Sequence, residues 1–379
     1  MRADPKNLPK RRVVLCFLLA VFLILPALSA GCRKEPEKYT YSFTGCFDTV
    51  IQIIGYDTSE EAFSRLAQLA QSRFTELHRL FDIYHAYDGM NNIYTINQQA
   101  GIAPVVVDDR IISLLQFYQE KDALAPGVVN AALGPVLEIW RQYRSAALDN
   151  GQAAIPAPEE LQQASRFCDA RKIIIDPEQQ TVYLQDSGMM LDVGAVAKGY
   201  ATELVAQDLI AAGMTSGIIS AGGSNVRLIG APADGRQTWQ VGLQNPDGNL
   251  LDPDDQPLEI ILANNQSIVT SGDYQRYYEF NGQVYHHLID SKTLQPARYF
   301  RAVTIMTPDS GLADYLSTAV FLLPYDDGRR LIESLPDCEA LWIFADGHTE
   351  ATAGMTSVLQ SAQGSISSST TVSLSSGNG

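Results

Sequence analysis

The chain has 379 residues, enough for one large domain with insertions or for two to three domains of ordinary size. Hydrophobic residues make up 46% and charged residues 18%, a globular composition that excludes a disordered or fibrous protein. Lys and Arg number 27 against 43 Asp and Glu, which gives a formal net charge of -16. Phosphate backbones repel a surface of that sign, so we expect no nucleic-acid partner.

The N-terminal segment predicts export from the cytoplasm. Basic residues end at Arg12, an apolar run follows over residues 13–25, and small residues then lead to Cys32. The run is shorter than the roughly 20 residues that span a bilayer, which favours a cleaved signal over residues 1–31. Leu28-Ser29-Ala30-Gly31-Cys32 resembles a lipobox, and an ordinary secretory signal is the alternative. We therefore expect Cys32 to carry a lipid anchor on the extracytoplasmic or periplasmic face of a bacterial cell membrane.

Three cysteines follow the leader and Cys32, namely Cys46, Cys168 and Cys338. They are odd in number, far apart, and without a C-x-x-C spacing. The sequence therefore predicts neither a disulfide framework nor a zinc site.

The first half of the chain predicts strands followed by amphipathic helices, after a tether over residues 32–40. Residues 41–56 are rich in β-branched and aromatic residues, as in a strand pair or one bent strand. Apolar residues recur at helical intervals as far as Phe81, and Thr58 and Glu61 have capping-box spacing, which predicts a helix there. Further helices are predicted over 109–121 and 195–212, with a strand at 181–184.

The second half predicts short strands alternating with turns. Strands are expected at 217–220, 226–229, 239–243, 258–262, 277–280, 284–289, 302–306 and 341–344, with a helix at 312–323. Because strands cluster after helices, the pattern favours an α+β fold of mixed, largely antiparallel sheets packed with helices. We expect one domain over residues 41–354. The Ser-, Thr- and Gly-rich tail, residues 355–379, is expected to be disordered.

Two segments fit anion binding at a helix start or turn. Asp192-Val193-Gly194-Ala195-Val196-Ala197-Lys198-Gly199-Tyr200 places an acid, small residues and a lysine where free N–H groups attract anions. Close helix packing with an Asp192–Lys198 ion pair is the alternative. The glycine pair in Ser220-Ala221-Gly222-Gly223-Ser224 is typical of a plain tight turn, and a functional use is the alternative.

Two further segments contain residue types that transfer protons or bind metal ions. In His286-His287-Leu288-Ile289-Asp290, adjacent strand residues point to opposite faces, so one metal cannot easily bind both histidines. A His-x-x-Asp grouping can instead position a proton acceptor. Asp314, Ser317 and Thr318 are spaced i, i+3, i+4 and share one helical face. Such hard oxygens suit Mg²⁺, although spacing alone favours a solvated helix start.

Taken in order, these segments resemble motifs of the bacterial flavin transferases, the ApbE family of FAD:protein FMN transferases. Earlier stretches extend the likeness over residues 40–345: Phe47-Asp48-Thr49, Leu80-Phe81-Asp82-Ile83-Tyr84 with Asn92, and Gly127-Val128-Val129-Asn130 with Gly134, Pro135 and Trp140. The resemblance implies the flavin-transferase architecture. It also implies Mg²⁺-dependent transfer of FMN from FAD to a Thr or Ser hydroxyl of a target protein, with release of AMP.

The resemblance also implies roles for particular residues. Mg²⁺ would be bound by the Ala195 carbonyl, Asp314, Thr318 and Ser317. FAD would contact Phe47, Tyr84, Val128, Val129, Asn130, Asp192, Lys198 and Leu288. His287, Asp290 and Lys198 would be the catalytic groups, with His287 or a carboxylate as proton acceptor. The acceptor would be an extracytoplasmic protein such as a membrane redox subunit.

The chain departs from the family pattern at several positions. Ser317 stands where an acid is common, Asn130 where Asp is usual, and Ser224 where the Asp of G-G-D is usual. These changes bear on metal affinity and substrate contacts. They leave Asp314 and Lys198 in place.

Two other functions remain open on the sequence. One is a Mg²⁺-dependent FAD pyrophosphatase, in which water replaces the acceptor hydroxyl. The other is a non-enzymatic FAD-binding lipoprotein. In addition, Asp346-Gly347-His348-Thr349-Glu350-Ala351-Thr352 resembles the acceptor sequence D-G-x-T-x-A-T, which raises self-modification at Thr352 as a hypothesis.

Overall fold

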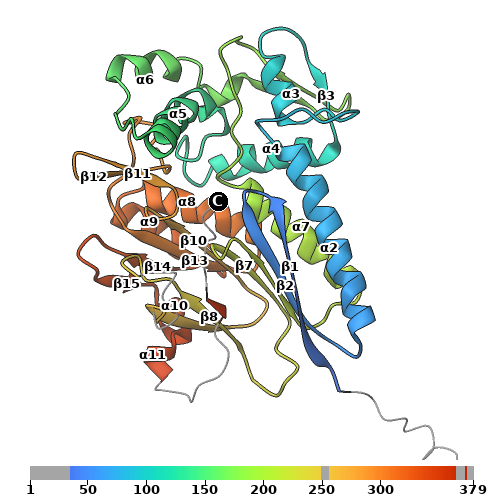
Figure 1. Cartoon of the computed structure of the whole chain (residues 1–379). Coiled ribbons are helices and arrows are strands. Elements are labelled where there is room, and N and C mark those ends of the chain that lie inside the picture. The colour runs from blue at the N-terminus through green and yellow to red at the C-terminus, as the bar shows by residue number, and fades with distance from the viewer. Residues whose placement is uncertain (1–34, 249–255, 364–371, 374–379) are drawn as a thin grey trace, which may run out of the picture.

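The computed structural model describes residues 35–248, 256–363 and 372–373. The expected signal, residues 1–31, and the expected lipidation site Cys32 lie outside these ranges. The described elements form a central antiparallel sheet with helices on one face, a small strand layer on the other, and a helical cap at one end (Figure 1). The structure therefore confirms the α+β class.

The central sheet has eight strands, and every neighbouring pair is antiparallel. In spatial order they are β1 (Glu37–Cys46), β2 (Thr49–Asp57), β6 (Gly217–Ala221), β7 (Asn225–Ile229), β10 (Ser267–Gly272), β13 (Ala302–Thr307), β14 (Glu339–Ile343) and β15 (Thr349–Ala351). Because β1 begins at Glu37, the expected tether, which extends to residue 40, is shorter than predicted.

One face of the sheet packs against helices. These are α2 (Glu60–Phe81), α7 (Ala197–Ala211) and α8 (Ser310–Leu322), with α9 (Tyr325–Glu333) outside α8. Alternate strand residues such as Ile53, Val269 and Val303 enter the apolar core that these helices share. The capping residue of α2 is Ser59, whose hydroxyl accepts from the Ala62 N–H, and the expected Thr58 cap is wrong by one position.

The opposite face of the sheet is covered by a second, smaller layer. It consists of β8 (Trp239–Leu243), β9 (Glu259–Ala263), β16 (Val372–Ser373), α10 (Ala353–Val358) and α11 (Gln360–Gln363). Met355 and Leu359 are buried with Trp239 in its core. The expected disordered tail is therefore wrong as far as residue 363, because its first apolar residues complete this layer.

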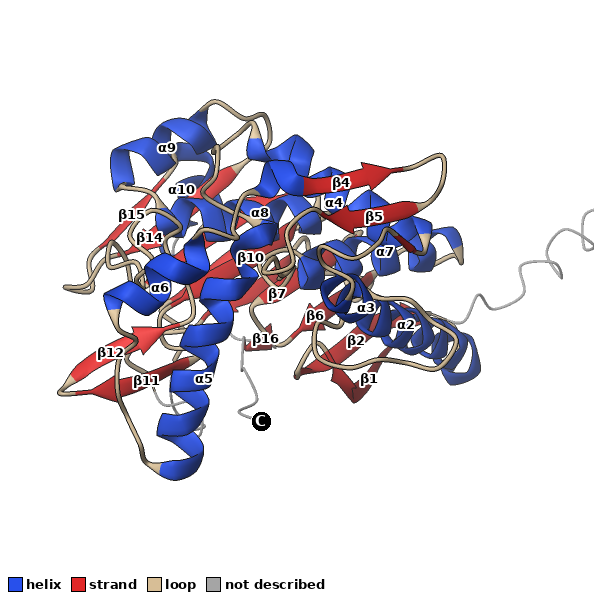
Figure 2. Ribbon diagram, turned by 90° about the horizontal axis from the view of Figure 1, so that it is seen from above, coloured by secondary structure: helices blue, strands red, loops and turns tan. Residues whose placement is uncertain are grey.

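A cap of helices and small sheets lies beyond the helical face (Figure 2). It contains α3 (Ile93–Gln98), β3 (Val105–Val106), α4 (Asp109–Asp122), the 3-10 turn η1 (Ala131–Leu133), α5 (Gly134–Asn150), α6 (Pro158–Ser165), the 3-10 turn η2 (Ala170–Lys172), β4 (Ile173–Asp176), β5 (Thr181–Leu184), β11 (Tyr277–Phe280) and β12 (Gln283–His286). The Trp140 ring of α5 stacks on Tyr285 of β12 at 5.8 Å. Its indole N–H donates to the Leu294 carbonyl at 2.9 Å, which ties α5 to the β11–β12 hairpin.

The structure confirms the predicted strand pair, the helices near 109–121 and 312–323, and the strands at 181–184 and 239–243. It also contains α5 and β10, which the sequence pattern does not predict. The start of α5 lacks a capping side chain. In β10 the hydroxyls of Thr270 and Ser271 are buried and satisfied by Thr304 and Ser317, at 2.9 Å each, so a polar-looking strand lies in the core. Among the described residues, no helix is both long enough and apolar enough to cross a bilayer.

Gly199→Ala tests the closest approach between α7 and α8. A Cβ at residue 199 would lie 2.4 Å from Asp314 Cβ and 2.4 Å from the Ser310 carbonyl oxygen. We expect the helices to separate and the free energy of unfolding to fall by about 1–3 kcal/mol in urea denaturation. The matched control is Gly328→Ala on α9, whose nearest contact is Val320 Cγ1 at 3.0 Å, with an expected change below about 1 kcal/mol. Equal losses in the two variants would contradict the argument.

Candidate active site

The start of α7 lies against α8, and this junction gathers several oxygen atoms. The Gly199 backbone N–H donates to Asp314 Oδ2 at 2.7 Å. The Thr318 hydroxyl donates to the Ala195 carbonyl oxygen at 3.5 Å. Since Thr318 lies one turn after Asp314, both side chains face α7. The structure thus brings Asp314, Thr318 and Ala195 together, as expected from the sequence.

Asp314 is a buried carboxylate with little compensation for its charge. The residue is only 7% exposed to solvent. Burial raises the pKa of Asp314 to about 6, while the nearby Lys198 ammonium and the Gly199 N–H act in the opposite direction. Within the described part of the chain, the second carboxylate oxygen accepts no hydrogen bond. A cation placed beside that oxygen would stabilise the ionised form.

Lys198 points to the glycine turn between β6 and β7. Its ammonium donates to the Ser224 hydroxyl at 2.5 Å. Burial lowers the pKa of Lys198, with Asp314 opposing and Arg276 adding to that effect. The turn packs closely against Thr49, which only glycine permits at residue 222. A Cβ there would lie 2.3 Å from Thr49 Oγ1, and φ is +67°. The second glycine segment therefore has a structural use that also positions the lysine's partner.

Asp192 does not form the ion pair with Lys198 that the sequence left open. Its Oδ1 accepts the Gly194 N–H at 2.8 Å, and its own N–H donates to the Ala131 carbonyl at 2.8 Å. Burial raises the pKa of Asp192, and three arginines oppose that rise. The residue shapes the loop that enters α7.

Ser317 is engaged within the protein. Its hydroxyl donates to the Asp314 carbonyl at 3.0 Å and lies 2.9 Å from the Ser271 hydroxyl of β10. Two protein partners leave it less free than Thr318 to act as a metal ligand. Its side chain is fully buried against the sheet.

The two adjacent histidines have different environments. His286 is buried, its Nε2 lies 2.7 Å from the Ala297 carbonyl, and its Nδ1 accepts the Leu288 N–H at 3.2 Å. His287 is half-buried, and only its Nδ1 has a partner, the Arg276 carbonyl at 3.3 Å. Burial, together with the charges of Arg276 and Arg144, holds the pKa of His287 well below its usual value. His287 is therefore neutral near pH 7 with Nε2 available, and His286 is structural.

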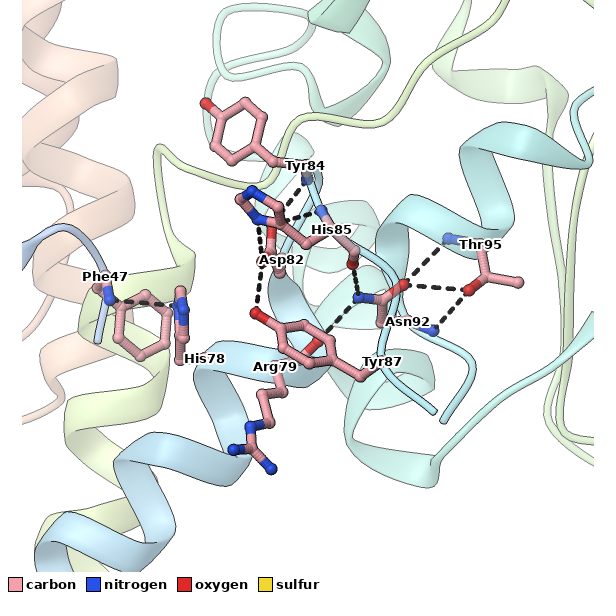
Figure 3. A network of polar contacts seen from close by, with 9 residues as sticks. All are labelled: Phe47, His78, Arg79, Asp82, Tyr84, His85, Tyr87, Asn92 and Thr95. Atoms are coloured by element: carbon pink, nitrogen blue, oxygen red, sulfur yellow. Dashed lines mark hydrogen bonds and ion pairs between the residues drawn. The ribbon is translucent and has the colours of Figure 1, made fainter. Parts of the chain in front are cut away.

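Tyr84 extends from a loop that a polar network holds rigid (Figure 3). The Asp82 carboxylate accepts from the Tyr84 N–H at 2.6 Å and the Tyr87 hydroxyl at 2.7 Å, and lies 3.0 Å from His85 Nδ1. Burial opposes the ionisation of Asp82, but these bonds hold its pKa below the usual value. Fully buried Asn92 donates to the His85 carbonyl at 2.8 Å. The loop thereby presents a Tyr84 ring that is 44% exposed.

Phe47 occupies a strained two-residue turn between β1 and β2. Phe47 and Asp48 have φ of 54° and 51°, a left-handed conformation that such hairpins require and that aromatic residues rarely adopt. The Phe47 N–H donates to His78 Nδ1 at 3.3 Å (Figure 3). The Phe47 ring also packs edge-on against Phe74, with 6.4 Å between ring centres. Strain of this kind is typical of ligand-binding turns.

The remaining expected ligand contacts have their side chains turned inward. Val128, Val129 and Leu288 are buried in the main core. Asn130 accepts the Ala132 N–H and donates to the Cys168 carbonyl, both at 2.8 Å. Asp290 accepts the Lys292 N–H at 2.8 Å within a tight turn. Both polar side chains thus have structural partners.

A cavity of about 510 Å³ lies between α6 and the turn after Asp290. Its lining includes Gly127, Leu161, Cys168 and Lys292. Asp314, Lys198 and His287 do not line it. The cavity is therefore separate from the α7–α8 junction.

Three arginines near these residues were not anticipated by sequence reasoning. Arg141 and Arg144 lie on α5, and Arg276 immediately precedes β11. The Arg141 guanidinium lies 4.1 Å from the centre of the Tyr84 ring. The i, i+3 spacing of Arg141 and Arg144 becomes informative only once α5 is known to be a helix.

Thr352 is buried at the start of α10, where its hydroxyl bonds to Glu339 and accepts the Ala340 N–H at 3.1 Å. An acceptor hydroxyl must reach a reaction centre. This geometry weighs against self-modification of the folded chain at Thr352.

Comparisons with known proteins agree with this arrangement. The chain matches the ApbE family over residues 47–342. A Treponema pallidum protein named FAD:protein FMN transferase is 34% identical over 358 residues, covering 90% of this chain and 93% of that protein. A Klebsiella pneumoniae protein of the same name is 28% identical, covering 74% and 84%. The crystal structure of the ApbE protein from Thermotoga maritima gives a TM-score of 0.73 at 25% identity, covering 85% of this chain and 99% of that one.

His286 gives the stability of the protein a specific pH dependence. Burial lowers the pKa of His286 to about 4, from an ordinary value of 6.5. Between those values the unfolded chain binds a proton that the folded chain does not, so stability falls as pH decreases. We expect the stabilisation of wild type over His286→Gln to shrink by roughly 2 kcal/mol between pH 7 and pH 4.5, measured by urea denaturation. A constant difference would contradict the neutral, buried assignment.

Proposed function

The chain belongs to the ApbE family of flavin transferases, and on that premise we propose that it transfers FMN from FAD to a Thr or Ser hydroxyl of a target protein, with Mg²⁺ as cofactor and AMP as the second product. The observation that carries the proposal is the junction of Asp314 and Thr318 with the Ala195–Gly199 segment. It gathers a carboxylate, a hydroxyl, a carbonyl and an ammonium, and Arg276 acts electrostatically on both Lys198 and the neutral His287.

The donor set at this junction fits Mg²⁺. Asp314, Thr318 and the Ala195 carbonyl supply hard oxygens, and the buried Asp314 carboxylate has one oxygen without a protein partner. Within the described residues, no cluster of three His, Cys, Asp or Glu side chains could replace this set. An ion held by one carboxylate and neutral oxygens would keep waters and bind substrate phosphates, as Mg²⁺ does. When bound, it would neutralise phosphate charge.

His287 is the group best suited to accept the proton of the attacking hydroxyl. Its Nδ1 faces the Arg276 carbonyl, which favours the tautomer protonated at Nδ1 and leaves the Nε2 lone pair free. Its lowered pKa keeps it neutral at pH 7. Asp290, the other candidate, accepts a backbone N–H within its own turn. The proposed base is therefore His287 Nε2.

The reaction balances as one phosphoryl transfer. The acceptor oxygen forms a bond to the phosphorus of the FMN half, and the bond from that phosphorus to the bridging oxygen breaks. The electron pair leaves with AMP, and the hydroxyl proton passes to His287. Lys198, held by Ser224 next to Asp314, adds positive charge where the diphosphate charge develops.

We further propose that the reaction takes place outside the cytoplasm. The basis is the lipobox-like sequence at Cys32, which would anchor the chain to the membrane by lipid. An acceptor in the same compartment, such as a membrane redox subunit, would then be within reach.

The test is direct incubation of the mature domain with FAD, Mg²⁺ and a flavoprotein domain that bears the D-G-x-T-x-A-T sequence. We expect a fluorescent flavin on the acceptor in a denaturing gel, and AMP in solution. Free FMN without a labelled protein would identify a pyrophosphatase instead. Unchanged FAD would identify a binding protein.

Asp314→Asn should remove Mg²⁺-dependent transfer while preserving the shape of the site. We expect the rate of flavin labelling to fall at least about a hundredfold, with the thermal unfolding midpoint retained, because the amide cannot offer the cation a negative charge. The matched control is Asp169→Asn, a surface carboxylate paired with Arg171, which should label the acceptor at the wild-type rate. Unchanged labelling by Asp314→Asn would refute the metal assignment.

A further inference from the structure

Three arginines gather next to the junction in a protein whose net charge is strongly negative. Each of Arg141, Arg144 and Arg276 acts electrostatically on Asp192. Arg276 also acts on Lys198, and both Arg276 and Arg144 act on His287. The described fold therefore concentrates positive charge at one place on an acidic chain, where an anionic ligand could bind.

Helix α5 packs against the β11–β12 hairpin (Figure 2). This packing brings the arginines of α5 close to Arg276. The Trp140–Tyr285 stack at 5.8 Å and the Tyr278 hydroxyl bond to the Ala154 carbonyl at 2.8 Å fix the helix and its following loop against the hairpin. Arg144 lies one turn beyond Trp140, and Arg276 stands just before the hairpin. The Arg276 carbonyl, which lies 3.3 Å from His287 Nδ1, fixes its place relative to the proposed base.

Only one of the three guanidinium groups is paired. Arg141 forms an ion pair with Glu138 and covers the Tyr84 ring at 4.1 Å. Within the described residues, the Arg144 and Arg276 side chains have neither an ion pair nor a hydrogen bond. Arg144 is half-buried, and burial together with repulsion from Arg276 and Arg141 lowers its pKa. Asp192 acts on Arg144 from beyond ion-pair distance, and a half-buried cation without a directly bonded acid is costly unless an anion joins it.

We propose that Arg144 and Arg276, here named the arginine pair, bind the diphosphate of FAD without requiring the metal. This inference rests on the proposed function, since it assigns the ligand of the same site. Guanidinium groups bind phosphate oxygens through paired N–H donors, and two of them match a diphosphate better than a lysine does. The arginine pair acts electrostatically on His287, whose Nε2 would face the attacking hydroxyl in the proposed reaction.

The charge of the metal shell supports a role for this pair. Ser317, which stands where the family often has an acid, is a neutral side chain engaged by Ser271. The junction therefore offers Mg²⁺ a single carboxylate. Cations supplied by the protein would reduce the share of substrate binding that depends on the ion.

The test uses ADP as probe in the presence of EDTA, measured by calorimetry on the folded mature chain. We expect wild type to bind ADP without metal, and Arg276→Gln and Arg144→Gln each to weaken ADP binding by about tenfold to a hundredfold, the value of a charged hydrogen bond. Adenosine, which has no phosphate, should bind both variants as it binds wild type. Arg144→Lys should recover part of the affinity, which separates lost charge from lost packing.

Arg171→Gln is the matched control. It removes the same charge, but from an exposed arginine that is paired with Asp169. It should leave ADP binding unchanged. No ADP binding by wild type in EDTA, or equal affinities in wild type and both pair variants, would overturn the proposal. A raised KM for the acceptor protein with unchanged ADP affinity would also overturn it, and would assign the pair to an acidic segment of the acceptor. Flavin labelling by wild type with Mg²⁺ tests the transferase function independently of these outcomes.

Discussion

The structure depends on the contact between the first turn of α7 and the middle of α8. Gly199 permits it, because its missing side chain lets the two backbones approach and its N–H reach Asp314. The same contact brings the Ala195 carbonyl to Thr318 and places Lys198 beside a buried carboxylate. One glycine thus determines both the packing of two core helices and the geometry of the oxygens that we propose as metal ligands.

The site also shows how local charge can oppose the charge of the whole chain. The net charge of -16 disfavours anionic ligands at long range. At the junction the balance is reversed, because Lys198 and the arginine pair outnumber the ionised acids near them. Burial there lowers the pKa of the lysine and raises that of Asp314. In the proposed function, a bound cation would stabilise the ionised form of Asp314 and a bound polyanion the charged form of Lys198.

The adjacent histidines illustrate how neighbouring positions acquire different uses. A strand turns successive side chains to opposite faces, so His286 enters the core and His287 faces the arginines. The core position satisfies both ring nitrogens of His286. The other position leaves one nitrogen of His287 free, and only that residue is available for proton transfer.

The sequence by itself determined the α+β class and the family, and it indicated Asp314, Thr318 and Lys198 as candidate site residues, because short motifs with fixed spacing encode local geometry. Only the tertiary structure decided that Ser317 turns toward β10, since its partner Ser271 lies far away in the chain. The arginine pair likewise arises from the docking of α5 on a hairpin more than a hundred residues later in the chain. Contacts between such distant segments leave no periodic signal in the sequence, so their place in the site could not be predicted.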